Sequence, residues 1–200
     1  RESFIIRGMG RKKGGNSTAL LHPLSILEGE GAPQGSNNIT HLKEYSPKYP
    51  LTSLRGNIYK NTIAIYISEL LYRTLRDYER DPALYDFLEQ AILTLNAMEK
   101  GYSNFHLWFT IKYISFLGFM PDLSQQEVLA PFDPMEQNIL KGFLHLPLEE
   151  SMKISLSGEK RNSFIDSLVR FLEQNLERKI EIKSLKVLHE VLIWYLYYEF

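Results

Sequence analysis

Residues 8–17 hold the densest group of side chains that could contact an anion, in the order Gly8-Met9-Gly10-Arg11-Lys12-Lys13-Gly14-Gly15-Asn16-Ser17. Glycines let a backbone approach a phosphate closely, and Lys and Arg neutralise its charge. A dinucleotide-binding fingerprint would need glycine at 13, where Lys13 stands, and a P-loop would need Gly-Lys-Ser/Thr instead of Gly15-Asn16-Ser17. What remains is a basic loop that can follow a nucleic-acid backbone, with an ordinary solvated hairpin as the alternative.

Groups that could carry out bond chemistry are not spaced for it. The five histidines are scattered, and none lies within metal-ligand spacing of another: His22, His41, His106, His145 and His189. A zinc-protease helix at His189-Glu190 would need a histidine at 193, where the chain has Ile193. The absence of cysteine excludes disulfides, thiolate catalysis and cysteine-based zinc sites. We therefore predict no enzyme, metal site or cofactor, and a hydrolase with an unrecognised acid/base pair is the minor alternative.

The 200 residues are 44% hydrophobic, which is enough for a buried core in one large domain or two small ones. No run of eighteen apolar residues and no hydrophobic leader occur, so we expect neither a membrane span nor secretion, and a cytoplasmic location. The net charge of −1 conceals an asymmetry. Residues 1–60 carry nine Lys/Arg and four Asp/Glu, whereas residues 61–200 carry fourteen and twenty. The basic first part is suited to a polyanion, although unevenly distributed solvated charge is the plain alternative.

The first part of the chain is predicted to be a small β-sheet. Strand-like runs occupy Phe4–Arg7, Ala19–Glu28 with a bend at His22-Pro23, and Ile39–Tyr45, and the loop Gly29–Asn38 separates the last two. A sheet of three strands is marginal alone. We therefore expect further strands that would precede Arg1.

From about Asn57 the apolar period changes from two to 3.6 residues, which predicts helices. Asp81-Pro82 and Asp133-Pro134 are helix-start signals, and Glu136 three residues after Asp133 predicts a capping box. The predicted helices run from about 57 to 77, from 82 to Gly101, over 104–117, from 133 to about 144, over 161–177 and over 184–198. Residues 119–132 are expected to be irregular. The tyrosines and tryptophans on these helices indicate core packing more than base stacking.

The order of these elements resembles one known family at particular strings of residues. Phe4–Gly8 with the basic loop, and Leu20–Glu28, look like late strands of the oligonucleotide-binding (OB) domain of the bacterial recombination mediator RecO family. Further strings, in chain order, resemble its helices: Tyr49–Ser53, Ala64–Arg76, Asp81–Leu88, Ile114–Leu123 and Lys183–Leu188. The last is similar to the ending of relatives from the Bacteroides side of the family. The resemblance covers nearly the whole chain.

This resemblance implies an α+β fold, with an OB-fold-like small β-barrel, incomplete at its start, over residues 1–50 and an all-α domain of about six helices over 51–200. It implies a non-enzymatic protein that binds single- and double-stranded DNA, anneals complementary strands and, with RecR, helps load RecA onto DNA covered by single-strand-binding protein. Many members carry a four-cysteine zinc site shortly after the positions of Pro121 and Asp122. This chain has no cysteine, so zinc is not expected here.

The resemblance also suggests which side chains make contacts. The expected phosphate contacts are Arg7, Arg11, Lys12, Lys13 and Lys43, with Lys48, Arg55 and Lys60 as weaker candidates. The helical domain would receive the acidic C-terminal tail of single-strand-binding protein in an apolar groove, whose basic rim would include Arg73, Arg76 and Lys112. For these three, the alternative that they are ordinary helix-surface residues is the favoured interpretation. A helical protein-interaction scaffold that does not bind DNA is the rival hypothesis.

Overall fold

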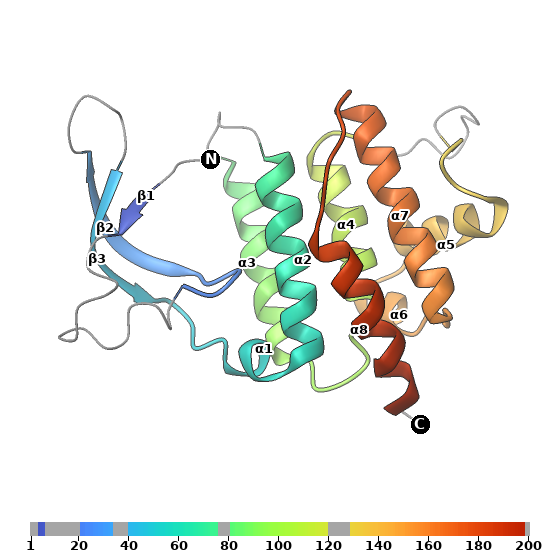
Figure 1. The fold of residues 1–200 in the computed structure, drawn as a ribbon, viewed down its shortest axis with the longest axis horizontal. Helices are drawn as coiled ribbons and strands as arrows, with labels where there is room; N and C mark the ends of the chain where they lie inside the picture. The colour runs from blue at the N-terminus through green and yellow to red at the C-terminus, as the bar shows by residue number, and fades with distance from the viewer. Residues whose placement is uncertain (1–3, 7–20, 34–39, 76–80, 120–128, 199–200) are drawn as a thin grey trace.

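The computed structural model describes residues 4–6, 21–33, 40–75, 81–119 and 129–198. Within them the chain forms a three-stranded sheet followed by eight helices (Figure 1). The predicted α+β class is confirmed.

The sheet has the order β1-β3-β2, with β1 at Phe4–Ile6, β2 at Leu27–Pro33 and β3 at Thr40–Pro47. β2 pairs antiparallel with β3, and the register shifts once, between Glu30 and Gly31. β1 pairs parallel with β3. In the described residues these strands form an open sheet, which is consistent with an OB-like domain that is incomplete at its start.

The second strand lies later in the chain than predicted. Residues 21–26 form a turn, in which the Ser25 amide donates to the His22 carbonyl at 3.0 Å and Leu24 has a φ of 60°. The strand instead runs through the predicted loop, because Gly29 lets β2 approach β3 closely. A Cβ atom at Gly29 would lie 2.5 Å from the Glu44 carbonyl oxygen. Glycine here marks close strand pairing and not a loop.

The six predicted helices are present. They are α2 (Ile58–Thr74), α3 (Pro82–Ala97), α4 (Phe105–Phe116), α5 (Pro134–His145), α7 (Gly158–Asn175) and α8 (Ser184–Tyr198). Two five-residue helices were not predicted, α1 (Thr52–Gly56) and α6 (Leu148–Met152), because one turn is too short to show a period. α3 ends at Ala97, before the predicted stop at Gly101, which lies in the following link with a φ of 73°.

The predicted caps form as expected. The Asp81 carboxylate accepts from the Leu84 amide at 2.9 Å and begins α3. Asp133 and Glu136 make the reciprocal capping box at the start of α5. Gly118 follows α4 with a φ of 83°, the left-handed conformation that glycine adopts without strain.

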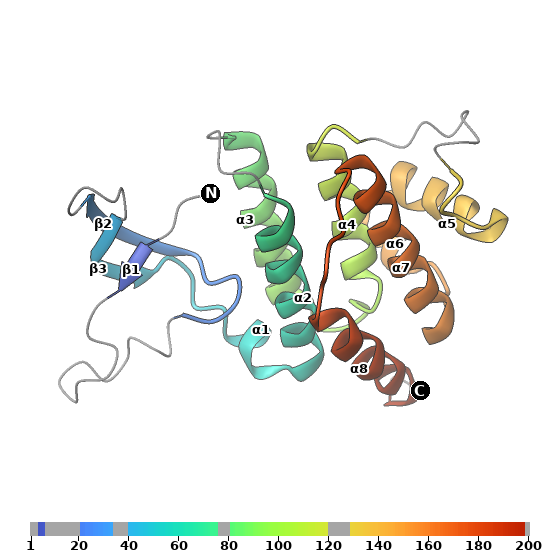
Figure 2. The ribbon, with the colours of Figure 1, turned by 45° about the horizontal axis from the view of Figure 1, so that its top comes forward.

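The core belongs to the helical body, which we define as residues 51–198. α4 is its central helix, with eight of twelve residues buried, and it packs between α2 on one side and α5 and α7 on the other (Figures 1 and 2). Two buried hydroxyl pairs join α4 to α2, Tyr66 with Thr110 at 2.9 Å and Thr74 with Tyr113 at 2.7 Å. Among the residues whose burial the structure describes, every buried one lies at Leu51 or later.

Candidate DNA-binding and partner surfaces

Two of the predicted DNA contacts lie where the sheet meets the helical body. Lys48 Nζ lies 2.6 Å from Glu89 Oε1 on α3, and this hydrogen bond raises the pKa of the lysine. Arg55 Nη2 donates to Ser25 Oγ at 3.2 Å. Both side chains are half-buried. They connect the segments flanking the sheet to the helices, so a phosphate would have to compete with these internal partners.

Lys60 is placed differently from the prediction. It is 1% exposed, and its ammonium donates to Ser53 Oγ at 2.7 Å, to the Asn96 carbonyl at 3.1 Å and to the Met98 carbonyl. Burial lowers its pKa. The lysine therefore joins the start of α2 to α1 and to the end of α3, and its ammonium cannot reach a DNA phosphate from this position. Sequence could not reveal this, since nothing local to Lys60 predicts three acceptors converging on it.

For the remaining predicted DNA contacts the structure describes no side-chain position. Arg7, Arg11, Lys12 and Lys13 lie outside the described residues. Lys43 lies on β3.

One face of the β2–β3 pair is acidic. Glu28, Glu30 and Glu44 are exposed, Glu30 lies directly opposite Glu44, and the three line a shallow hollow of about 470 Å³. Three carboxylates on one face repel phosphate. DNA contacts of this sheet are therefore expected away from that face.

Two of the three predicted rim residues of the partner groove are described, and their contacts differ. Arg73 Nη2 lies 3.7 Å from Glu69 Oε1 on the same helix, α2. Lys112 on α4 donates to the Leu144 carbonyl of α5 at 3.4 Å. Arg76 lies outside the described residues.

A pocket of about 690 Å³ lies where α2, α4 and α7 end and α3 begins. Its lining residues are Thr74, Asp81, Pro82, Leu84, Phe116, Leu117, Phe119, Asn175, Leu176 and Glu177. Among the described lining residues the two charged members, Asp81 and Glu177, are both acidic. The C-terminal ends of α2, α4 and α7 add partial negative charge, and the N-terminal end of α3 adds partial positive charge. The described part of the lining therefore offers no cationic side chain to an acidic peptide.

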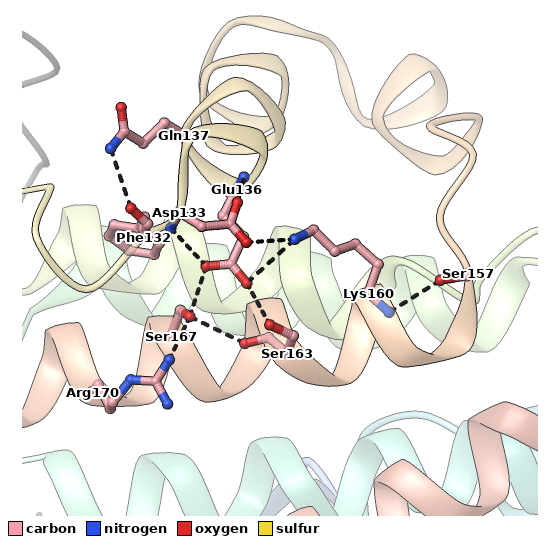
Figure 3. Close-up of polar contacts among 9 residues, drawn as sticks. All are labelled: Phe132, Asp133, Glu136, Gln137, Ser157, Lys160, Ser163, Ser167 and Arg170. Atoms are coloured by element: carbon pink, nitrogen blue, oxygen red, sulfur yellow. Dashed lines mark hydrogen bonds and ion pairs between the residues drawn. The ribbon is translucent and has the colours of Figure 1, made fainter.

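Figure 3 shows a buried carboxylate, Glu136, that could be mistaken for a catalytic group. Its side chain is 2% exposed and accepts from Ser163 Oγ at 2.6 Å, Ser167 Oγ at 2.8 Å and the Asp133 amide at 3.2 Å, with Lys160 Nζ at 3.9 Å. These contacts fasten α5 to α7. Because the carboxylate is fully occupied by internal donors, the arrangement is that of a structural tie.

The histidines are also placed structurally. His106 is buried in α4, and burial, followed by the charges of Arg161 and His189, lowers its pKa to about 3. His189 Nε2 lies 3.5 Å from Asp166 Oδ1. Across the described ranges, no group of three or more His, Cys, Asp or Glu could hold a metal ion. None of the helices in those ranges is long and apolar enough to cross a membrane.

Sequence reasoning overlooked a basic segment between α7 and α8. We call residues 178–183 the strap. Lys179 and Lys183 on the strap, and Lys186 in the first turn of α8, are all exposed, whereas Ile180 and Ile182 are buried. The signal was available as the alternating string Lys179-Ile180-Glu181-Ile182-Lys183, which is typical of an extended segment with one buried side.

Comparison with known proteins identifies the family. The model described as "Recombination protein O C terminal" matches residues 55–129. The "DNA repair protein RecO" of Porphyromonas gingivalis is 35% identical over 202 residues, which cover 88% of this chain and 81% of the relative. The chain belongs to the RecO family.

Other RecO relatives match along almost the entire chain. The "DNA repair protein RecO" of Azobacteroides pseudotrichonymphae is 28% identical over 207 residues, covering 94% of this chain and 86% of the relative. The "DNA repair protein RecO" of Flavobacterium psychrophilum is 29% identical over 206 residues, which cover 95% of this chain and 86% of the relative. No solved structure matches significantly. The resemblance drawn from the sequence is confirmed, and RecO membership supports a role in DNA repair and recombination.

Proposed function

We propose that this RecO-family chain binds single- and double-stranded DNA without catalysing bond chemistry and anneals complementary strands. With RecR it would help load RecA onto DNA covered by single-strand-binding protein, in the bacterial cytoplasm at the nucleoid. The observation that carries this proposal is the match to proteins named for DNA repair over most of the chain. The excess of positive charge in residues 1–60 supports it, because neutralising phosphates is the main source of sequence-independent DNA affinity.

The proposed division of labour follows the two parts of the chain. Residues 1–50 would form the DNA-binding domain and residues 51–200 the domain for protein partners. The proposed phosphate contacts are Arg7, Arg11, Lys12, Lys13 and Lys43, with Lys48 and Arg55 contributing only where DNA displaces Glu89 and Ser25. Lys60 is left out because it is buried. Arg73, Arg76 and Lys112 remain the proposed contacts for the acidic tail of single-strand-binding protein.

The test is a titration of a fluorescent single-stranded oligonucleotide with the full chain at several salt concentrations. The variant Arg11→Ala/Lys12→Ala/Lys13→Ala is measured beside it. Each phosphate contact on a single strand adds about 0.7 to the slope of log affinity against log salt. Loss of three contacts should therefore flatten the slope by about 2 and weaken binding at low salt by about tenfold or more.

The matched control is Lys100→Ala/Lys141→Ala/Lys153→Ala, which removes the same charge from exposed positions elsewhere on the helical body. It should bind like the unmodified chain. An unmodified chain that fails to bind even at low salt would refute the proposal and favour the helical interaction scaffold. Equal weakening by both triple variants would show a general charge effect and remove the loop from the interface.

A further inference from the structure

The strap is held firmly along α2. Two residues after α7 ends, Glu177 lies in the left-handed region at a φ of 52°, and this turn reverses the chain. Arg178 Nη2 then donates to the Arg73 carbonyl at 2.7 Å, and the Ile180 amide donates to Glu173 at 2.8 Å. At the far end, Glu69 accepts from the amides of residues 183 and 184 at 3.1 and 2.8 Å. Figures 1 and 2 both show this segment beside α2.

The extended backbone sorts the strap's side chains onto two sides. Ile180 and Ile182 are 6% and 8% exposed and face the core. Lys179, Glu181 and Lys183 are exposed, and Lys186 continues the same surface onto α8. Within the described part of the chain, none of these three lysines has a salt-bridge partner. At about 3.3 Å per residue, Lys179 and Lys183 are roughly 13 Å apart, so they can contact different phosphates of one strand.

An exposed aromatic ring lies beside this basic row. Tyr72 on α2 is 57% exposed, and Arg73 Cζ lies 5.8 Å from the centre of its ring. The contacts of Arg178 with Arg73 and of Lys183 with Glu69 place the strap along this same part of α2. A row of cations beside an exposed aromatic ring is the combination that binds single strands without sequence preference, because phosphates meet the cations and bases stack on the ring.

We propose that the strap surface, formed by Lys179, Lys183, Lys186 and Arg178 with Tyr72, is a second contact site for single-stranded DNA. It rests on the proposed function and deepens it, since annealing requires two strands held at once with their charge neutralised. Figures 1 and 2 place α3 and α2 between the sheet and the strap. One strand on the sheet and another on the strap would therefore occupy separate surfaces of the molecule.

Neighbouring carboxylates set the strength of this site. Glu181 is exposed in the middle of the row and Glu177 is exposed at its start, so both oppose phosphate binding. Glu69 contributes less repulsion, since its charge already accepts three hydrogen bonds from residues 183 and 184. The net positive charge is modest, which suits a strand that must be released after annealing. The repulsion by Glu181 also provides a test with the opposite expected effect, because removing its charge should strengthen DNA binding.

The experiment measures two quantities on the full chain: the number of single-stranded oligonucleotides bound at saturation, and the rate at which two complementary oligonucleotides anneal. For Lys179→Ala/Lys183→Ala/Lys186→Ala we expect one bound strand instead of two, and annealing slowed about tenfold. The first strand should bind as before, because the loop is unchanged. Glu181→Gln should accelerate annealing, and Tyr72→Phe should preserve it while Tyr72→Ser slows it.

The controls separate this inference from the function on which it rests. Lys100→Ala/Lys141→Ala/Lys153→Ala should retain two bound strands and the normal annealing rate. If the strap variant behaves like this control, the second site is refuted while the loop variant still decides whether the chain binds DNA. The variant Lys179→Arg/Lys183→Arg/Lys186→Arg should anneal at the normal rate, since it keeps the positive charge. Failure of that rescue, with thermal unfolding unchanged, would also overturn the proposal.

Discussion

The sheet and the helical body are stabilised in different ways. Every residue that the structure describes as buried belongs to the body, while the described positions of β2 and β3 are exposed or half-buried. Burial of apolar surface is the largest favourable term in folding, so the body carries most of the stability. The sheet therefore has a surface that can be devoted to charge, including the acidic face of Glu28, Glu30 and Glu44.

The described contacts between the two regions include both polar and apolar side chains. Lys48 pairs with Glu89, and Arg55 donates to Ser25. Leu24, Ile26 and Tyr49 add partly buried apolar contacts to the core of the body. We infer that the body folds and remains folded largely independently of the sheet.

The largest expected effect comes from the core. Phe164 on α7 is 0% exposed and its ring lies near those of Phe143 and Phe132. Phe164→Ala should lower the free energy of unfolding by about 3–5 kcal/mol, because the cavity cannot refill. Tyr45→Ala on β3 should cost much less in the same urea titration. Equal losses would break the comparison by showing that the sheet shares the core's cooperative stability.

A smaller effect is expected at the buried tie between α5 and α7. Glu136→Gln keeps the shape of the side chain but replaces one acceptor oxygen with a donor facing Ser163 or Ser167. We expect a loss of about 2–3 kcal/mol, the usual cost of an unmatched buried group. Glu159→Gln, an exposed change at the start of α7, is the matched control and should be nearly neutral. A neutral Glu136→Gln would mean that the tie contributes little to the body.

The body should also be the acid-sensitive region, through His106. Its pKa is lowered to about 3 in the folded chain from 6.5, so the unfolded chain binds the proton more readily between these values. Stability is therefore fully present above pH 6.5 and falls as the pH drops toward 3. Through this residue, the free energy of unfolding should be about 2 kcal/mol lower at pH 5 than at pH 8. His106→Gln should flatten that part of the stability curve, and an unchanged curve would assign the acid sensitivity elsewhere.

Local signals in the sequence predicted the body well. The 3.6-residue period and the caps at Asp81 and Asp133 depend on residues within a few positions of one another, and the structure contains them. The family could also be identified from the sequence, since the resemblance depends on the order of such local strings along the chain.

The errors concern contacts between distant residues. Gly29 looked like a loop residue. A side chain is excluded there by the Glu44 carbonyl, which lies fifteen positions later in the sequence. Lys60 looked like a surface cation, because its acceptors on Asn96 and Met98 lie at the end of α3, more than thirty residues away. The strap's alternating pattern is a local signal, but its position along α2 is fixed by Glu69 and Arg73, more than a hundred residues earlier. Such long-range pairings carry no local signature.

The smallest expected effect, and the sharpest test of the comparison, lies at the junction. Lys48→Ala removes an ion pair whose lysine and glutamate side chains are 30% and 13% exposed. Pairs accessible to water contribute little to global stability, so the urea midpoint of the body should not move measurably. Hydrogen exchange should nevertheless quicken around the sheet, for instance at the Lys48 amide, which donates to the Ile26 carbonyl. The altered residue then affects local opening and leaves the core intact.

Glu89→Gln is the partner test of this pair. The hydrogen bond from Lys48 lowers the pKa of Glu89, so the pair persists at neutral pH and is lost as the pH falls through that lowered value. Either single change should therefore give the same faster exchange at pH 7, and the double variant should add nothing, because both remove one interaction. High salt should reduce the difference from the unmodified chain. If Lys48→Ala instead lowered the global midpoint as strongly as Phe164→Ala, sheet and body would be one cooperative unit, and the independence inferred from their burial would be wrong.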